Sequence, residues 1–435
     1  MSPPQTELLQ RNLTSHIIDL LAEEPVLVLH GARTAGKSTL LTMLANRTGA
    51  SVIDLDELDV RDSVADDPAL FASGPSPVLI DEFQKVPELL DAIKAELNRN
   101  LRPGRFVLTG STRYTALPSV AQSLTGRVHI VNLWPLSQGE LAGTREDFVE
   151  HLLDDPLSLV AAAPSPTMRA QYERRILAGG FPLAVRRATE RGRSRWFDDY
   201  VNLVIERDVL ELRKVRQRDV LPRLLRLLAA QTAQVLNVAH AADRAGLEKP
   251  TAGDYVQLLE SVFLVYRLPA WGRNLGNRIT AHPKIHLVDS GLAAHLLGLS
   301  AQRLASKQPA ALTTFGHIVE TFAVGEILRQ VECLAEPLDI GHFRTRDQVE
   351  VDLVLETYDG RVFAIEIKAG SRVAGDDLRG LRTLRDKIGA SFVGGVVLHL
   401  GTHSYTLEDR INAVPLDRVW TPAQDNPVPA THPSI

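Results

Sequence analysis

The chain contains a single cysteine and no long apolar run. Cys333 is the one cysteine among 435 residues, which excludes an internal disulfide and a cysteine-rich zinc site. No stretch approaches the ~18 uninterrupted apolar residues that a membrane-spanning helix requires. The N-terminal residues also lack the basic start, apolar run and small-residue cleavage site of a signal peptide. We therefore expect a cytoplasmic protein with no membrane partner.

The charges of the chain are nearly balanced, which limits what it can bind non-specifically. The formal net charge is −5, with 44% apolar and 23% charged residues, the profile of an ordinary soluble globular protein. Affinity for nucleic acid would therefore need a local basic patch. Residues 167–228 carry 15 Arg or Lys and 8 Asp or Glu, a local charge of +7. This segment is either such a patch or a set of solvated helices whose arginines pair with carboxylates.

A phosphate-binding loop is the clearest motif in the sequence. The apolar run Pro25–His30 (PVLVLH) predicts a buried strand, and it leads into GARTAGKST at Gly31–Thr39 and then into a helical pattern. Strand, glycine-rich loop and helix are the context that the G-x-x-x-x-G-K-[ST] motif requires. In that motif backbone N–H groups face the phosphates, Lys37 reaches the β- and γ-phosphates, and Ser38 ligates Mg²⁺. The sequence therefore predicts a nucleotide site with a magnesium ion.

Two acids at the end of a second strand predict hydrolysis of the nucleotide. Pro77–Glu82 (PVLIDE) is an apolar run that ends in Asp81 and Glu82. We expect Asp81 to hold the Mg²⁺ shell, and Glu82 to orient and deprotonate the attacking water. GTPases of the Ras type place this water with a glutamine. The Asp-Glu pair therefore favours an ATPase that carries its own base.

A third strand completes the expected nucleotide site. Phe106–Thr112 (FVLTGST) ends in small hydroxyl residues, and either Thr109 or Ser111 could contact the γ-phosphate or the water. Arg127, at the end of a predicted helix, could reach the γ-phosphate of a neighbouring subunit in a homo-oligomer. Arg113 is the competing candidate, and a plain structural arginine is the third possibility. The residues expected to contact the nucleotide are Gly31, Ala32, Arg33, Thr34, Ala35, Gly36, Lys37, Ser38, Thr39, Thr109 and Ser111.

These segments together resemble one group of AAA+ ATPases. GARTAGKSTL, LIDEFQKVPELLDAIK, FVLTGST and LTGRVHIVNLWPLSQGE are similar to the AAA_14-type ATPases of bacteria and archaea whose C-terminal part is a domain of unknown function, DUF4143. Gly179–Leu212, which contains GGFP and ERD, resembles the linking helices of that group. The resemblance extends to about residue 400. It implies an α/β fold with a P-loop core on a parallel sheet, followed by a helical linker.

The middle of the chain has the pattern of a winged helix–turn–helix. A leucine-rich stretch with helical spacing is followed by a helix that Asn237 caps and Gly246 ends, and then by a third helix. Two candidate strands follow, separated by a loop that carries glycine and arginine. The expected elements are helices at 219–234, 238–246 and 251–262 and strands at 263–268 and 284–289.

The side chains of this region leave DNA binding open. A helix that reads the major groove normally presents Arg, Asn or Gln to base edges, whereas the third helix offers Lys249 and Thr251 together with Asp254 and Glu260. The expected wing is better suited to phosphate contacts. Its candidate residues are Arg267, Arg273, Asn274 and Arg278. The region is therefore either a DNA contact or a lid that packs within the protein.

The C-terminal region carries acids and a lysine within a helix and two apolar strands. A helix is expected over Phe315–Val331, and it carries Glu320. Asp352 lies inside the apolar strand VEVDLVLE, and Glu366 and Lys368 alternate with isoleucine in RVFAIEIKAG, so that both point to one face of their strand. This arrangement resembles that of the PD-(D/E)xK nucleases, in which two carboxylates hold a divalent cation and a lysine positions the water. We expect Asp352 and Glu366 to bind the cation, with Glu320 completing the shell.

Other features of this region weaken the prediction of cleavage. No proline resembling the usual Pro-Asp step precedes Asp352, although the fold does not depend on it. His317 and His342 are near the acids in the sequence and are expected at the surface. The domain is therefore either an active nuclease or an inactive nuclease scaffold.

The sequence predicts five segments. They are an AAA+ core at 1–150, a helical lid or linker at 151–215, a winged helix at 216–300, a nuclease-like α/β domain at 301–415 and a disordered tail at 416–435. We expect a protein that binds and hydrolyses ATP and acts on DNA or RNA through its C-terminal half. The alternative is a nucleotide-switched signalling or defence regulator whose nuclease-like domain is inactive and serves recognition. A small-molecule kinase would not need these appended regions.

Overall fold

The chain folds into two units, each assembled from separate stretches of sequence. The computed structural model describes residues 8–111, 124–160, 163–209, 212, 219–272 and 282–422. The first unit comprises Met1–Gly143, Leu177–Arg267 and Ile285–Ser300, and the second comprises Thr144–Ile176, Leu268–Lys284 and Ala301–Ile435. Among the described residues, no helix has the length and apolarity needed to cross a membrane.

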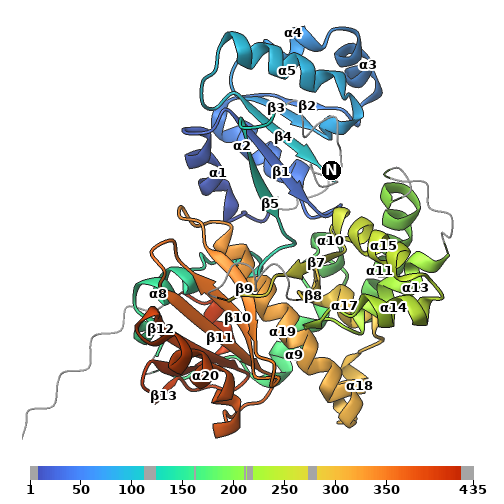
Figure 1. The fold of residues 1–435 in the computed structure, drawn as a ribbon. Coiled ribbons are helices and arrows are strands. Elements are labelled where there is room, and N and C mark those ends of the chain that lie inside the picture. Colours follow the sequence, from blue (N-terminus) through green and yellow to red (C-terminus); the bar gives the residue numbers. More distant parts are fainter. Residues whose placement is uncertain are drawn as a thin grey trace, which may run out of the picture. The chain divides into compact units, whose positions relative to one another are not determined.

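A five-stranded parallel sheet forms the core of the first unit (Figure 1). Its strand order is β2-β3-β4-β1-β5, and β1, β3 and β4 are buried along their whole length, as apolar strands covered on both faces should be. This confirms the P-loop core on a parallel sheet. The strands are β1 (Val26–Gly31), β2 (Val52–Asp54), β3 (Val78–Asp81), β4 (Phe106–Gly110) and β5 (Val128–Leu133).

Short helices cover this sheet. The core cluster joins apolar residues of β1, β3 and β4 to Leu89, Ile93 and Leu97, which repeat along one face of α5. The helical elements are α1 (Leu13–Leu21), α2 (Lys37–Thr48), α3 (Leu58–Asp66), α4 (Pro68–Ala72), the 3₁₀ turn η1 (Phe83–Lys85), α5 (Glu88–Arg99) and α7 (Gln138–Ala142).

The remainder of the first unit is mainly helical. α11 continues into a π-helical turn, η4, and three later helices match the three expected from the sequence. The Asn237 side chain accepts a hydrogen bond from the His240 N–H at 2.9 Å, and Gly246 ends α14 in the left-handed conformation, so both predicted caps are confirmed. The elements are α10 (Pro182–Val185), α11 (Glu190–Leu203), η4 (Val204–Val209), α13 (Val220–Ala229), α14 (Val238–Ala245), α15 (Lys249–Ser261) and α17 (Ser290–Leu296).

The expected pair of wing strands belongs to a three-stranded sheet. The sheet contains β7 (Val265–Leu268), β8 (Lys284–Leu287) and a short strand that the sequence did not predict, β6 (Gln234–Val235). β6 lies at the edge beside β8, in the order β6-β8-β7. Arg267 is not a free phosphate contact, because its Nε donates to Glu260 Oε2 at 2.8 Å. Arg273, Asn274 and Arg278 lie outside the described residues. The winged-helix assignment stays a prediction.

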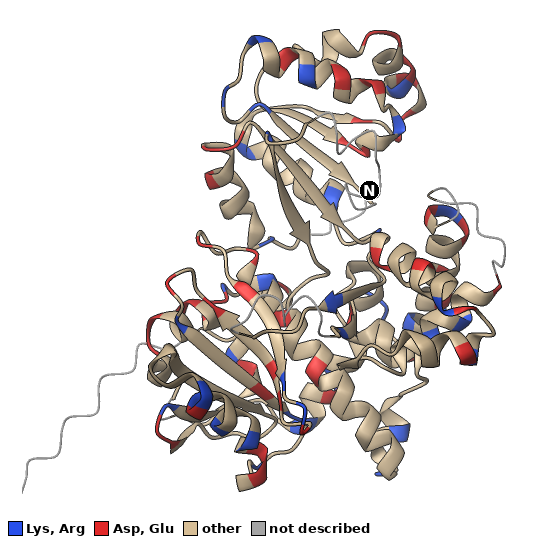
Figure 2. Cartoon of the chain, viewed as in Figure 1, with Lys and Arg blue, Asp and Glu red and all other residues tan. Residues whose placement is uncertain are grey.

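Acidic and basic residues alternate along the helices that follow the five-stranded sheet. Figure 2 shows red and blue segments side by side on these helices, whereas the strands of that sheet are almost entirely tan. Within the Arg-rich segment, Arg169 Nε pairs with Glu173 Oε1 at 2.9 Å. For the described part of 167–228, this pair agrees with the interpretation of solvated helices with paired charges.

A six-stranded mixed sheet forms the core of the second unit. Its order is β13-β14-β12-β11-β10-β9; β9, β10 and β11 are antiparallel, whereas β11, β12 and β14 run parallel. α20 packs Leu381, Leu384 and Ile388 against this sheet. The strands are β9 (Asp339–Arg344), β10 (Glu350–Glu356), β11 (Val362–Lys368), β12 (Phe392–His399), β13 (Tyr405–Glu408) and β14 (Ile411–Pro415).

Two segments of the second unit extend beyond the bounds expected from the sequence. α19 begins at Pro309 rather than Phe315, with the proline in its first turn. The ordered chain also continues past residue 416, because Leu416, Val419 and Trp420 are buried. The helical elements are α8 (Phe148–Asp154), η3 (Pro156–Leu159), α9 (Arg169–Ala178), α18 (Ala301–Ala305), α19 (Pro309–Val331), η5 (Gly375–Leu378), α20 (Arg379–Ile388), η6 (Gly389–Ser391) and η7 (Leu416–Val419).

Candidate functional site

The loop between β1 and α2 has the backbone that the phosphate-binding motif predicts. A side chain at Gly31 would overlap the carbonyl oxygen of Leu133 on β5, and Gly36 has a positive φ of 102°. Neither position accommodates another residue without strain. The loop therefore leads directly into α2, whose first residue is Lys37.

Lys37 lies across this loop. Its Nζ donates hydrogen bonds to the carbonyl oxygens of Gly31 at 2.9 Å and Ala32 at 3.1 Å, and the residue is 5% exposed. Burial lowers the pKa of Lys37, while Glu82 and Asp81 act in the opposite direction. The loop follows β1 and the acids end β3, and the parallel order β3-β4-β1 places both at one edge of the sheet.

Arg11 braces the same loop, a role that the sequence did not reveal. It is buried, and its guanidinium donates to the carbonyl oxygens of Ala35 at 2.8 Å and Trp134 at 2.7 Å and to Glu140 Oε1 at 3.0 Å. These bonds connect the loop to the segment after β5. No local sequence pattern around Arg11 predicts this contact.

The structure brings together the side chains that were expected to handle hydrolysis. Because β3 and β4 are parallel neighbours, their carboxyl ends meet at one edge of the sheet. Thr109 Oγ1 donates to Asp81 Oδ1, and Ser111 Oγ donates to Glu82 Oε2 at 3.3 Å. Gln84, which was not among the residues expected from the sequence, donates to the Glu82 carboxylate as well. Two hydrogen bonds therefore orient the glutamate that was expected to act as the base.

Glu82 also has an uncommon backbone. Its φ is 52° and its ψ is 45°, a left-handed conformation that non-glycine residues rarely adopt. Its N–H donates to Asp81 Oδ1 at 3.1 Å and Thr109 Oγ1 at 3.3 Å. The conformation turns the chain sharply after β3, so that Asp81 and Glu82 both stay at the end of the strand.

The residues around the loop offer the ligands that Mg²⁺ prefers. Asp81 is 3% exposed and carries a carboxylate beside a hydroxyl, and the Ser38 hydroxyl lies in the first turn of the helix after the loop. Carboxylate and hydroxyl oxygens suit a hard divalent cation. The donor set therefore fits a magnesium ion, with Asp81 and Ser38 as the residues that would hold it.

Arg33 connects the loop to the helices that follow the core. Its Nε donates to Asp208 Oδ2 at 2.9 Å and its Nη2 to Asp208 Oδ1 at 2.6 Å. Asp208 is 3% exposed and lies on η4. The Glu-Arg-Asp step is visible in the sequence as a family feature, but the partner of its aspartate is 175 residues away.

Arg127 contacts α5 in this structure. Its Nη1 donates to Asn98 Oδ1 at 2.7 Å, and Asn98 belongs to that helix. Arg113, the competing candidate, lies outside the described residues. Action of Arg127 on a neighbouring subunit stays a prediction.

The acids of the second unit gather around a lysine that was not among the residues expected from the sequence. Lys284 is fully buried, and its Nζ lies 2.6 Å from Glu320 Oε1 and 3.0 Å from Asp352 Oδ1. It also forms an ion pair with Glu350. Although burial opposes the shift, Asp352, Glu320 and Glu350 raise the pKa of Lys284 well above its ordinary value. Lys284 is therefore a charged ammonium in the centre of three carboxylates.

Two of the three expected metal ligands, Glu320 and Asp352, lie together in this arrangement. Ligand oxygens of Glu320, Glu350 and Asp352 lie within 4.8 Å of one another, so the group contains Glu350 in place of Glu366. The Lys284 ammonium bridges these carboxylates in this structure, and cation binding by Glu320 and Asp352 stays a prediction. Glu350 could have been found from the sequence, since it lies two residues before Asp352 on the same strand. A lysine within the apolar strand KIHLVD was a signal for Lys284.

Glu366 and Lys368 contact each other, as their alternation predicts. Lys368 Nζ donates to Glu366 Oε1 at 2.7 Å. Asp352 reaches the same strand, because its Oδ2 accepts the Ile367 N–H at 2.9 Å. Burial and the neighbouring Asp352 raise the pKa of Glu366 to about 8. The three side chains therefore converge, and Glu366 has a lysine as its partner.

The two histidines near these acids are not surface residues. His342 is 1% exposed and His317 is half-buried. A ring nitrogen of His342, Nε2, donates to the His282 carbonyl oxygen at 3.2 Å. Burial, and then Lys284, lower the pKa of His342 to about 4. The expectation of a surface position was wrong for His342, because sequence position alone does not reveal burial within a sheet.

Comparison with known families accounts for three parts of the chain. Residues 23–142 match the family model described as "AAA domain", and residues 315–419 match a domain of unknown function, DUF4143. The chain carries an AAA domain and a DUF4143 domain. Between them, residues 169–303 match a second domain of unknown function, DUF8612, which covers the expected linker helices and winged helix. The resemblance to an AAA_14-type ATPase with a DUF4143 domain is thus confirmed.

Curated relatives and solved structures show similarity over long stretches. An uncharacterized protein of Mycobacterium tuberculosis is 26% identical over 414 residues, which cover 95% of this chain and 85% of the relative. An uncharacterized protein of Haemophilus influenzae is 23% identical over 289 residues, or 65% of this chain and 63% of the relative. A Walker-type ATPase of Pyrococcus abyssi is similar over 67% of this chain and 97% of its own, with 16% identity and a TM-score of 0.42.

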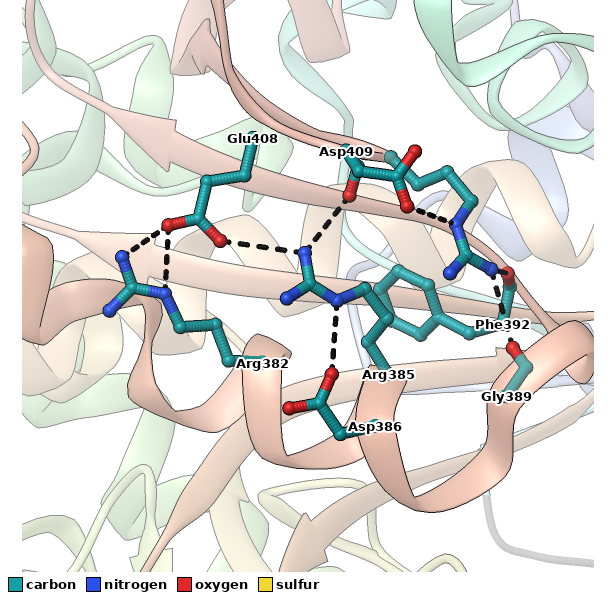
Figure 3. A network of polar contacts seen from close by, with 8 residues as sticks. Arg382, Arg385, Asp386, Gly389, Phe392, Glu408 and Asp409 are labelled. Atoms are coloured by element: carbon teal, nitrogen blue, oxygen red, sulfur yellow. Dashed lines mark hydrogen bonds and ion pairs between the residues drawn. The ribbon is translucent and has the colours of Figure 1, made fainter.

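The basic helix of the DUF4143 domain is neutralised by the hairpin beside it. Figure 3 shows Glu408 between Arg382 and Arg385 of α20. Arg382 Nε donates to Glu408 Oε1 at 2.9 Å, and Arg385 Nη1 lies 3.4 Å from Glu408 Oε2. Arg385 Nη1 also donates to the Asp409 carbonyl oxygen at 3.1 Å. These arginines hold α20 to the β13–β14 hairpin and have protein partners already, so they do not form an open phosphate-binding surface.

Proposed function

We propose that this protein binds ATP with Mg²⁺ at Gly31–Thr39 and hydrolyses the ATP with Glu82 as the general base. The single observation that carries the proposal is the convergence of two elements. The loop that holds Lys37 follows β1, and Asp81 and Glu82 stand at the end of β3. Because β3, β4 and β1 are parallel neighbours in that order, the loop and the acids lie at the same edge of the sheet. A phosphate chain on the loop would then lie beside a carboxylate that can accept a proton from water.

Each residue has one task in this proposal. The loop N–H groups and Lys37 bind the phosphates, and Ser38 and Asp81 hold the magnesium ion, which neutralises charge on the phosphates when bound. Glu82 orients the attacking water and accepts its proton. Ser111 and Gln84 fix the Glu82 carboxylate, so that little reorganisation is needed when the water arrives. Thr109 holds Asp81 in the same way.

The experiment is ATP turnover by the full chain with Mg²⁺. Lys37→Ala should abolish or greatly weaken nucleotide binding, because the phosphates lose their main side-chain cation. Glu82→Gln keeps the shape of the side chain and removes the base, so ATP should bind and remain unhydrolysed. Glu57→Gln, an exposed residue elsewhere in the AAA domain, is the matched control and should turn over ATP normally. Normal turnover by Glu82→Gln would refute the assignment of the base.

A second proposal concerns the C-terminal half of the chain. We infer that the DUF4143 domain serves recognition on a nuclease-like scaffold, within a nucleotide-switched regulator. The supporting observation is Lys284, whose ammonium takes the position between Glu320 and Asp352 that a catalytic cation would need. Action on DNA or RNA as an active nuclease is the competing proposal, supported by the convergence of Asp352, Glu366 and Lys368.

One set of assays separates these proposals. Wild-type protein is incubated with duplex DNA, single-stranded DNA and RNA, each with Mg²⁺ or Mn²⁺, and cleavage and ATP turnover are measured together. A recognition domain predicts no cleavage, with a nucleic acid or another partner altering ATP turnover. Cleavage that Asp352→Ala abolishes while ATP turnover persists would instead establish the nuclease.

A further inference from the structure

A partly buried ion pair joins the phosphate loop to the helices after the AAA core. Arg33, the third residue of the loop, holds both carboxylate oxygens of Asp208, at 2.9 Å from Nε and 2.6 Å from Nη2. The Asp208 side chain is 3% exposed and that of Arg33 is 27% exposed. A two-point arginine–carboxylate pair is among the stronger and more directional polar contacts in proteins.

Asp208 belongs to an unusual element. η4 (Val204–Val209) is a π-helical turn at the end of α11, and such turns are rare and often lie at functional sites. Val204, Ile205 and Val209 are buried with Asp208, whereas Glu206 is exposed. Asp208 is therefore the acid of this turn that faces inward, toward the loop.

The pair lies close enough to the nucleotide site to respond to phosphate. Asp208 and Arg33 both act on the Lys37 ammonium, with opposite signs, and Lys37 is the residue that binds the β- and γ-phosphates in this motif. A triphosphate on the loop would repel the Asp208 carboxylate and attract the Arg33 guanidinium. Guanidinium groups form two-point hydrogen bonds with phosphate as well as with carboxylate, so phosphate and Asp208 would compete for Arg33.

We propose that Arg33 exchanges Asp208 for the γ-phosphate of ATP, so that ATP binding releases the Val204–Val209 turn. This inference rests on the proposed ATP site and adds its regulation. ADP lacks the γ-phosphate and leaves the pair in place. The turn therefore distinguishes ATP from ADP and passes that difference to the helices of the DUF8612 region.

Coupling of this kind is reciprocal. If ATP weakens the Arg33–Asp208 pair by some factor, removing the pair must strengthen ATP binding by the same factor. The Asp208→Asn variant removes the carboxylate charge at nearly constant shape. Its affinity for a non-hydrolysable ATP analogue should rise by roughly tenfold, a typical coupling between sites, while its affinity for ADP should stay close to that of the wild type.

The test measures amide hydrogen exchange in peptides that span residues 200–209 of the full chain. Wild-type protein is compared without nucleotide, with Mg²⁺ and ADP, and with Mg²⁺ and AMP-PNP. We expect AMP-PNP to accelerate exchange in this segment and ADP to leave it unchanged. Asp208→Asn should exchange fast in all three states. Glu206→Gln, which makes the same charge change at an exposed position of the same turn, should behave as the wild type.

The outcomes separate this inference from the proposed function. If wild-type protein binds AMP-PNP but exchange at 200–209 does not change, the exchange of partners is refuted while the ATP site stands. If Asp208→Asn weakens AMP-PNP and ADP binding equally, Asp208 only braces the loop, and the inference is again refuted. Failure of the wild type to bind either nucleotide would overturn the proposed function and this inference together. The wild-type comparison decides the matter even if Asp208→Asn does not fold.

Discussion

Lys284 and Asp352 form a buried ion pair, with Nζ 3.0 Å from Oδ1, and Glu320 and Glu350 share the same ammonium. One cation therefore compensates three carboxylates. Removal of that cation leaves like charges close together in a poorly hydrated place, which is costly for a folded protein.

The first prediction follows from this pair. Lys284→Met should lower the free energy of unfolding by about 3–5 kcal/mol, the usual cost of breaking a buried ion pair by removing one partner. Urea unfolding of the full chain measures the change. Lys307→Met, at an exposed position of the same unit, should change it by less than about 0.5 kcal/mol. Equal stability of the two variants would show that Lys284 is not the counter-ion of the cluster.

The second prediction concerns metal binding by the same acids. Mn²⁺ or Ca²⁺ should raise the melting temperature of the wild-type protein no more than that of Glu320→Gln, because Lys284 already bridges these carboxylates. Lys284→Ala opens the space between oxygens that lie within 4.8 Å of one another, and either ion should then raise the melting temperature. The double variant Lys284→Ala with Glu320→Gln is the control and should respond less. A Glu320-dependent response of the wild type would mean that a cation can displace the ammonium.

The third prediction tests the effect of pH on His342. Its pKa is lowered to about 4 by burial and by Lys284, while the Glu350 carboxylate acts the other way and Arg344 adds to the lowering. A histidine with a lowered pKa binds its proton more readily in the unfolded chain. The stability that neutral His342 contributes is therefore complete above its unfolded pKa, about 6.5, and is lost as the pH falls toward 4.

The loss attributable to His342 should reach about 3 kcal/mol over that range. It is measured as the difference in pH dependence between wild type and His342→Gln, which cannot titrate. The variant should have the flatter profile between pH 6.5 and 4. His240→Gln, at an exposed position, should follow the wild type. Parallel profiles for wild type and His342→Gln would rule out a protonation penalty at this residue.

The fourth prediction concerns the approach of β5 to the phosphate loop. Gly31→Ala would place a methyl group on the carbonyl oxygen of Leu133, so β5 or the loop must move. We expect a loss of about 1–3 kcal/mol of stability together with weaker ATP binding. Gly253→Ala, where a methyl group meets no atom within 4 Å, should be neutral or slightly stabilising, since alanine is the better helix former. Unchanged ATP affinity in Gly31→Ala would show that the loop tolerates this shift.

The fifth prediction concerns Arg127. If it acts on the γ-phosphate of a neighbouring subunit, Arg127→Ala should slow ATP turnover by about 10³-fold with little loss of ATP affinity. Mixing it with Glu82→Gln protein should restore part of the activity, because mixed interfaces contain one intact site. Arg99→Ala, an exposed arginine on α5 with one long ion pair, is the control. A strictly monomeric active enzyme in sedimentation would disprove this role.

The local parts of the nucleotide site could be predicted from the sequence. Each motif is contained in one strand and the segment that follows it, as for the loop at Gly31–Thr39 and the acids Asp81 and Glu82. Residues of one such motif are close in space because they are close in the sequence. Parallel strands also bring their carboxyl ends to one edge, which is why the strand pattern alone assigns Thr109 and Asp81 to the same nucleotide site.

Pairs between distant segments could not be predicted in this way. Arg33 and Asp208 are 175 residues apart, and nothing in either segment specifies the other. Lys284 precedes Asp352 by 68 residues and lies in a strand that was assigned to another segment. An isolated charge in an apolar strand does indicate that a partner exists, but only the fold determines which one.

The interleaving of the two units in the sequence has a consequence for any attempt to divide this protein. Each unit takes three stretches of the chain, and α8 is tied to α19 through the Val149 N–H and Gln330 Oε1 at 3.0 Å. A fragment that stops at residue 300 would keep α8 and lose the residues that bury it, leaving an apolar helix face in water. Such a fragment should aggregate, so a boundary at residue 300 would not separate the ATPase core from the DUF4143 domain as two folded pieces.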